Sequence, residues 1–225
     1  EVDALVKEFL PDPYVYEVPN EENDTANITH RVLTVDPEDR SAVLLRLVQG
    51  EGKSIIFTRT KMTAERLSES LTQAGVPAAR LHGDLNQNQR NRNLERFTKG
   101  ACRVLVETDV SARGIHVDGI SLVVHFDAPT DHKDYLHRSG RTARAGEEGN
   151  VVLLSTTKSQ SGVKSLTSRA GVSPIFVHVE PMSNELIDIT GAVEPSGIPY
   201  IAPVMENKGP SRGNRRPRPN SSERR

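Results

Sequence analysis

Short apolar runs recur along the chain, and stretches with apolar residues at helical spacing separate them. Runs that are apolar throughout are typical of strands covered on both faces of a parallel sheet. The alternation of strands and helices therefore predicts an α/β domain with a mainly parallel sheet and right-handed crossovers. We expect strands near residues 30–35, 54–57, 78–81, 103–106, 122–126, 151–154 and 175–179.

Helix boundaries have recognisable signals between these strands. Asp36-Pro37-Glu38 combines a capping Asp, a Pro suited to the first helical position and an acidic residue in the first turn. Gly50 and Gly75 follow amphipathic stretches and favour helix ends. We expect further helices from about residue 87 to 99 and near residues 158–169.

The two flanks differ from the body in composition. Residues 1–29 hold a short amphipathic piece, two prolines and an acidic polar stretch, and are interpreted as an interdomain linker. Hydrophobic periodicity fades after Met182. The sequence thus predicts one domain over residues 30–182 and an extended tail over residues 183–225, basic and disordered from about residue 206.

Charge and cysteine content limit the binding partners and the cellular compartment that the sequence suggests. The whole chain has a net charge of -1, but residues 205–225 carry +5 and the rest carries -6. An acidic body binds a polyanion only through a local patch. A single cysteine, Cys102, excludes an internal disulfide and fits a reducing compartment. No apolar run is long enough to span a bilayer, so we expect a cytoplasmic protein.

Candidate chemistry lies where ligands of such sheets bind, after the carboxyl ends of the strands. His82-Gly83-Asp84 follows a predicted strand, with Gln87 and Arg90 at the start of the next helix. A glycine that lets a ligand approach the backbone, amide donors and an arginine suit a phosphate backbone. A capped surface loop is the alternative.

Two other segments carry polar groups at expected ligand positions. Thr108-Asp109 ends a predicted strand, and Gly114 follows in the next loop. Arg138, Arg141 and Arg144 recur every third residue and share one face of a helical turn. Guanidinium groups are planar, permanently charged and bidentate, which suits phosphate oxygens. A solvated basic helix end is the alternative interpretation.

Some classes of site are excluded by the sequence. Gly52-Lys53-Ser54 is not a P-loop, because Leu47 stands where the motif needs a glycine and the segment precedes its strand. The seven histidines do not pair with cysteines or carboxylates at metal-ligand spacing. No Gly-x-Ser-x-Gly nucleophile motif is present.

Four blocks together resemble the C-terminal RecA-like domain of a bacterial DEAD-box RNA helicase. The resemblance spans residues 30–182 and implies a three-layer α/β/α RecA-like fold. Residues 1–10 also resemble the end of the family's first domain, which runs into the interdomain linker. Ile55-Ile56-Phe57-Thr58-Arg59-Thr60 resembles motif IV, and His82-Gly83-Asp84-Leu85 with Gln87 and Arg90 resembles motif IVa. Residues 104–116 resemble motif V, and residues 137–146, beginning His137-Arg138-Ser139-Gly140-Arg141, resemble motif VI.

The resemblance implies roles for individual residues. Arg141 and Arg144 would be arginine fingers that reach the γ-phosphate of ATP, and Gly114 and His116 would lie at the nucleotide. His137 and Arg138, with Arg138 held by Asp109, would couple this domain to the first RecA-like domain. The RNA sugar-phosphate backbone would be held by Thr58, Arg59, Gly83, Asp84, Gln87, Arg90 and Thr108.

Several positions depart from the family pattern. His116 stands where an Asp usually binds the ATP ribose, which predicts weaker nucleotide binding, because an imidazole offers at most one acceptor. Glu107 replaces a small residue and is expected to place a negative charge near the RNA path. Ser139 replaces an aliphatic residue, and Ala143 replaces a glycine.

The P-loop, the Asp-Glu-Ala-Asp motif, the Ser-Ala-Thr motif and the Q motif of the family's first domain are not found in this sequence. The resemblance therefore implies an RNA helicase and ATPase as a full protein, using ATP with Mg²⁺ held by the first domain. RNA binding would be largely independent of base sequence, and the isolated chain would be inactive. The alternatives are a superfamily 2 DNA helicase domain and a RecA-like module without catalysis. The basic tail is either an auxiliary RNA-binding arm or a solubilising segment.

Overall fold

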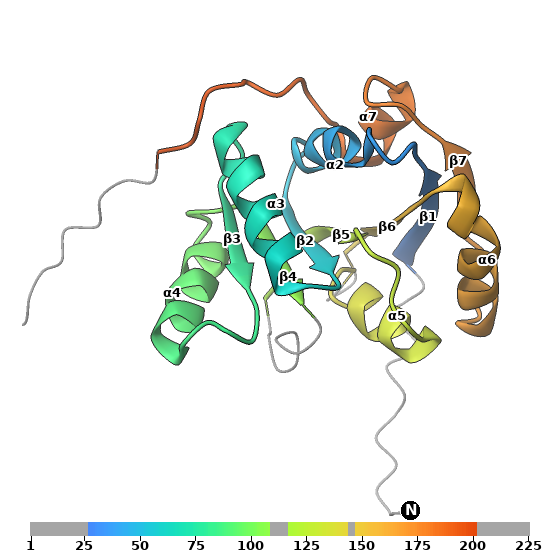
Figure 1. Cartoon of the computed structure of the whole chain (residues 1–225), viewed down its shortest axis with the longest axis horizontal. Helices are drawn as coiled ribbons and strands as arrows, with labels where there is room; N and C mark the ends of the chain where they lie inside the picture. Colours follow the sequence, from blue (N-terminus) through green and yellow to red (C-terminus); the bar gives the residue numbers. More distant parts are fainter. Residues whose placement is uncertain (1–26, 109–116, 144–146, 202–225) are drawn as a thin grey trace, which may run out of the picture.

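The computed structural model describes residues 27–108, 117–143 and 147–201. Seven parallel strands form one sheet in the order β3-β4-β2-β5-β6-β1-β7, with helices on both faces (Figure 1). The strands are β1 (Ile28–Thr34), β2 (Lys53–Thr58), β3 (Ala78–Leu81), β4 (Val104–Thr108), β5 (Ile120–His125), β6 (Gly149–Ser155) and β7 (Ile175–His178). The helices are α2 (Arg40–Val48), α3 (Lys61–Gln73), α4 (Gln87–Thr98), α5 (His132–Ser139), α6 (Gln160–Arg169) and α7 (Asn184–Thr190).

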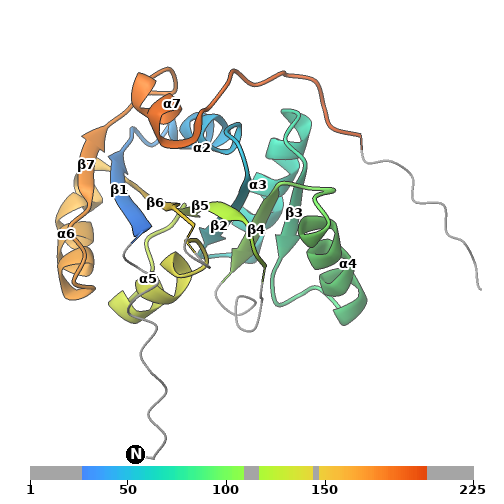
Figure 2. The same cartoon turned by 180° about the vertical axis from the view of Figure 1, so that it is seen from behind.

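Two hydrophobic cores lie on opposite faces of the sheet. Alternate strand residues point to opposite faces, so Ile56 joins one core while Ile55 and Phe57 join the other. The first core is closed by α2, α3 and α7, and the second by α4, α5 and α6. Figure 2 shows the same arrangement of the whole molecule from behind. This is the predicted RecA-like three-layer α/β/α arrangement, and all seven predicted strands are confirmed. None of the described helices is long and apolar enough to cross a membrane.

The start of α2 differs from the expectation. The helix begins at Arg40 rather than at Pro37, and residues 37–39 form a turn closed by the Asp39 N–H donating to the Asp36 carbonyl. The Asp39 side chain makes no capping hydrogen bond. The Asp-Pro-Glu signal therefore marks a turn that precedes the helix, since the same residues favour both structures.

A further helix lies within the segment that the sequence predicts as extended. α7 packs its Leu186 and Ile189 against α2 in the first core. Beyond α7 the chain runs extended across the molecule, and the Tyr200 N–H donates to the Thr72 carbonyl at the end of α3 (2.9 Å). The Tyr200 hydroxyl donates to the Ala101 carbonyl (3.2 Å). Residues 184–200 are therefore attached to the domain at both ends, by α7 and by Tyr200.

We predict that Leu186→Ala lowers the free energy of unfolding by about 2–5 kcal/mol, because it leaves a cavity in the first core. The neighbouring Ile187 is 41% exposed, so Ile187→Ala should change it by less than about 0.5 kcal/mol. Urea-induced unfolding of the chain measures both variants. Equal effects of the two substitutions would show that α7 is not part of the cooperative unit.

Candidate nucleic-acid and nucleotide interface

The predicted RNA-contact residues come from three adjacent strands. β4 lies between β3 and β2, with Thr58 of β2 in register with Thr108 and Leu81 of β3 in register with Glu107. The residues that follow Thr58 and Leu81 therefore emerge beside the end of β4 at the carboxyl edge of the sheet. The fold thus gathers segments that are about 25 residues apart in the sequence into one surface.

The turn after β2 is fixed to the end of β5. The Phe57 carbonyl accepts hydrogen bonds from the N–H groups of Phe126 (3.0 Å) and Asp127 (3.3 Å). The Asp127 carboxylate accepts the Arg59 N–H (2.9 Å) and lies 3.6 Å from the Arg40 guanidinium of α2. The side chain of Thr58 is buried and donates to the Thr60 carbonyl, so Arg59 is the exposed residue of the predicted Thr58-Arg59 pair.

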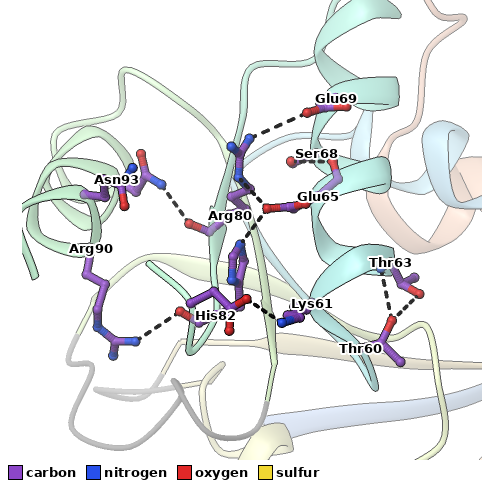
Figure 3. A network of polar contacts seen from close by, with 12 residues as sticks. Thr60, Lys61, Thr63, Glu65, Ser68, Glu69, Arg80, His82, Arg90 and Asn93 are labelled. Atoms are coloured by element: carbon purple, nitrogen blue, oxygen red, sulfur yellow. Dashed lines mark hydrogen bonds and ion pairs between the residues drawn. The ribbon is translucent and has the colours of Figure 1, made fainter. Parts of the chain in front are cut away.

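The loop after β3 is held by α3 on one side and by α4 on the other (Figure 3). His82 is buried, and its Nε2 lies 3.4 Å from the Glu65 carboxylate of α3. From α4, Arg90 donates to the His82 carbonyl (3.5 Å) and Asn93 donates to the Arg80 carbonyl (2.8 Å). The His82 side chain is thus an internal support of the loop.

The next two residues of this loop face solvent. Gly83 is exposed, and a Cβ placed there would meet no atom within 4 Å, so a ligand can approach the backbone. Asp84 is exposed and forms an ion pair with Lys61 at the start of α3. Gln87 is exposed at the start of α4 and donates to Asn91 (2.9 Å). The structure therefore places Gly83, Asp84 and Gln87 on the surface at which RNA binding is predicted.

The predicted nucleotide-facing residues lie on α5 and the turn after it. Arg138 is 5% exposed. Its guanidinium lies over the Phe57 ring (5.0 Å to the centroid) and donates to the Asp127 carbonyl (3.4 Å). His137 is exposed and Arg141 is half-buried. Asp127 and Phe57 thus connect the turn that carries Arg59 with the helix that carries His137 and Arg138.

A stacked column of rings lies beneath α5. The His125 ring stacks on Tyr135 with centroids 4.8 Å apart and on Phe57 at 6.0 Å. His30 Nδ1 lies 2.8 Å from the Tyr135 hydroxyl. Burial lowers the pKa of His30 to about 4. Burial also holds the pKa of His125 well below its usual value, and the nearby positive charge of Arg138 lowers it further. Both histidines are therefore neutral at pH 7, His125 fully buried in the core and His30 half-buried at its edge.

The structure describes the surroundings of two residues that depart from the family pattern, Glu107 and Ala143. The expectation that Glu107 presents charge to the RNA path is wrong, because its side chain is 1% exposed. Glu107 shares a face of β4 with Leu105 and so points under the helices of the second core. Ala143 has φ 57°, which costs a residue with a Cβ about 1–2 kcal/mol and explains why the family pattern has glycine there.

Four predicted site residues, Asp109, Gly114, His116 and Arg144, lie outside the described residues. Among the described residues, no group of three or more His, Cys, Asp or Glu side chains could hold a metal ion. Sequence reasoning did not identify Asp127, Glu65 or Lys61, because each acts through a partner that is distant in the sequence. Only the position of Asp127 at the carboxyl end of a predicted strand could have indicated it.

Comparison with known proteins gives consistent matches. Residues 39–146 match the model of the helicase conserved C-terminal domain. The chain is 34% identical to the ATP-dependent RNA helicase RhlB of Xanthomonas axonopodis pv. citri (strain 306) over 185 residues, which is 81% of this chain. The chain spans about a third of that relative's length (32%).

Solved structures agree with these matches. The E. coli DEAD-box protein SrmB, bound to the regulator of ribonuclease activity A, is 33% identical with a TM-score of 0.60, covering 75% of this chain and 96% of that one. S. cerevisiae Dbp5 bound to RNA and ADP BeF3 is 31% identical with a TM-score of 0.68, covering 79% of this chain and 48% of that one.

We predict that stability falls as the pH decreases from about 6.5 toward 4. The unfolded chain binds protons at His30 and His125 in this range, whereas the folded chain does not, because burial depresses both pKa values. Urea unfolding at pH 7 and pH 5 measures the loss. His125→Phe keeps a ring in the stack and removes one titrating group, so its loss over this range should be smaller. An equal loss would contradict the assignment.

Proposed function

Since the chain belongs to the DEAD-box RNA helicases as a C-terminal RecA-like domain, we propose that it binds the RNA backbone and completes the ATP site of the full protein. The observation that carries the proposal is the surface formed at the carboxyl ends of β3, β4 and β2, next to α5 and the turn with Arg141. The similarity to Dbp5, whose structure holds RNA and ADP BeF3, supports the same assignment.

RNA would lie along the edge formed by the turns after β2 and β3. Arg59 and Arg90 supply cations, and Gly83 leaves the backbone open to a phosphate. Aromatic residues make up 4% of the chain and Trp is not found in it, so base stacking contributes little to recognition. Binding would therefore follow the sugar-phosphate backbone and be largely independent of base sequence.

ATP would be hydrolysed at the cleft between this domain and the first RecA-like domain. Arg141, and Arg144 outside the described residues, would reach the γ-phosphate as arginine fingers. A guanidinium held near the transferred phosphoryl group offsets the negative charge of the transition state. His137 is exposed on α5 and would contact the first domain, which would also hold Mg²⁺.

Binding and hydrolysis would be coupled by closure of the two domains. ATP and RNA together would hold the domains closed on a bent strand and so separate short duplexes locally. Phosphate release would then reopen the cleft. The isolated chain would bind RNA weakly and would not turn over ATP, because half of the nucleotide site belongs to the first domain. We propose a cytoplasmic location, consistent with a lone buried Cys102.

We predict that Arg141→Ala lowers the RNA-stimulated kcat of the full-length protein by about 10³-fold. RNA affinity in the absence of nucleotide should stay within about threefold, because Arg141 contacts the nucleotide and not the RNA. Arg141→Lys keeps the charge without the planar fork and should recover only part of the rate.

Arg66→Ala, at an exposed position of α3, is the matched control and should leave the rate unchanged. The rates are measured by phosphate release at saturating RNA. Equal rates for wild type and Arg141→Ala would remove the finger role and favour a module without catalysis. A wild type stimulated by DNA rather than RNA would favour the DNA helicase alternative.

A further inference from the structure

Lys61 is a cation at the proposed RNA surface that the family motifs did not assign. It is the first residue of α3, placed by Thr60, whose hydroxyl accepts the Thr63 N–H (3.1 Å). Figure 3 shows Lys61 and Arg90 on opposite sides of the loop that begins at His82. Arg90 contacts His82 and Lys61 contacts Asp84, so the exposed Gly83 lies between the two residues that they hold.

The partner of Lys61 is a carboxylate from the same loop. Lys61 Nζ donates to Asp84 Oδ2, and the two side chains are 55% and 60% exposed. This hydrogen bond raises the pKa of Lys61 and lowers that of Asp84, so both groups are charged at pH 7. A carboxylate oxygen and a phosphate oxygen are the same class of acceptor for an ammonium group. Asp84 therefore satisfies Lys61 in the way that an RNA phosphate would.

The pair is also easy to exchange. An exposed ion pair contributes little to stability, because water screens it and two flexible side chains must be ordered to form it. Lysine carries a compact charge on a flexible stem, so its ammonium can turn from Asp84 to a neighbouring anion without a change in the backbone. The surrounding loop is held independently by Glu65, Arg90 and Asn93, and the exchange would leave it in place.

We infer that Lys61 contacts an RNA phosphate and that Asp84 is its internal competitor, which RNA must displace. The inference rests on the proposed function and gives Asp84 a role opposite to the one expected from the motif. If Asp84 held the RNA backbone, its loss would weaken binding. If Asp84 instead occupies Lys61 and repels phosphates, the loss of its carboxylate strengthens RNA binding.

The experiment measures the affinity of the full-length protein for a fluorescein-labelled oligouridylate at several salt concentrations. Lys61→Ala should weaken binding about three- to tenfold and reduce the slope of log K against log[salt] by about 0.7, the value for one phosphate contact to a single strand. Lys61→Arg should retain the slope. Asp84→Asn should tighten binding about two- to fivefold, because RNA no longer has to break the pair.

The chain contains a matched control pair. Lys99 and Glu95 form an ion pair of the same kind at the far end of α4 (2.6 Å), with side chains 71% and 55% exposed. Lys99→Ala and Glu95→Gln should each change the affinity by less than about twofold. Thermal unfolding of all variants tests that the fold is intact.

Weaker binding by Asp84→Asn, or an unchanged affinity and salt slope for Lys61→Ala, would overturn the inference. Effects of equal size at the Lys99–Glu95 pair would also overturn it, since they would reflect net charge alone. A wild-type protein that does not bind the oligouridylate would overturn the proposed function itself. The two failures are distinguishable because only the second affects the wild type.

Discussion

The described surface depends on the junction between the end of β2 and the end of β5. The Phe57 carbonyl accepts two N–H groups from Phe126 and Asp127, and the Asp127 carboxylate accepts the Arg59 N–H in return. The Asp127 carbonyl also accepts from Arg138, whose guanidinium covers the Phe57 ring. Parallel strands end at the same edge of a sheet. This one junction therefore sets the position of the turn that carries Arg59, on the proposed RNA side, relative to α5 on the proposed nucleotide side.

Most of the sheet could be predicted from the sequence because its strands are buried on both faces. Such strands are short, continuous apolar runs, and each of the seven was placed within about two residues of its ends, the usual uncertainty of such boundaries. α7 was not predicted, because its seven residues present only Leu186 and Ile189 to the core and are too few to show a helical repeat of apolar positions. The start of α2 was misplaced because Asp-Pro-Glu is compatible with a turn as well as with a first helical turn.

Local sequence determined the site less completely. The motifs identified which loops form the surface, and the strand order brings them together. Exposure at this edge of the sheet could not be read from residue type. Thr58 and Glu107, at the ends of β2 and β4, are buried, while Asp84 and Gln87 are exposed. Residues that hold the loops, such as Glu65 and Asp127, are 17 and 68 positions from the groups they contact. Their roles depend on which residues of different strands and helices meet in the fold. Hydrophobic periodicity predicts the elements but not their register.

The most direct measurement of the central claim is ultraviolet crosslinking of the full-length protein to single-stranded RNA with an ATP analogue, followed by mass spectrometry of the crosslinked peptides. RNA lying on the carboxyl edge of β2, β3 and β4 predicts crosslinks to peptides that contain residues 58–61, 82–90 and 108. Crosslinks confined to α6, β7 and α7, at the other side of the sheet, would contradict the assignment of this edge as the RNA-binding surface.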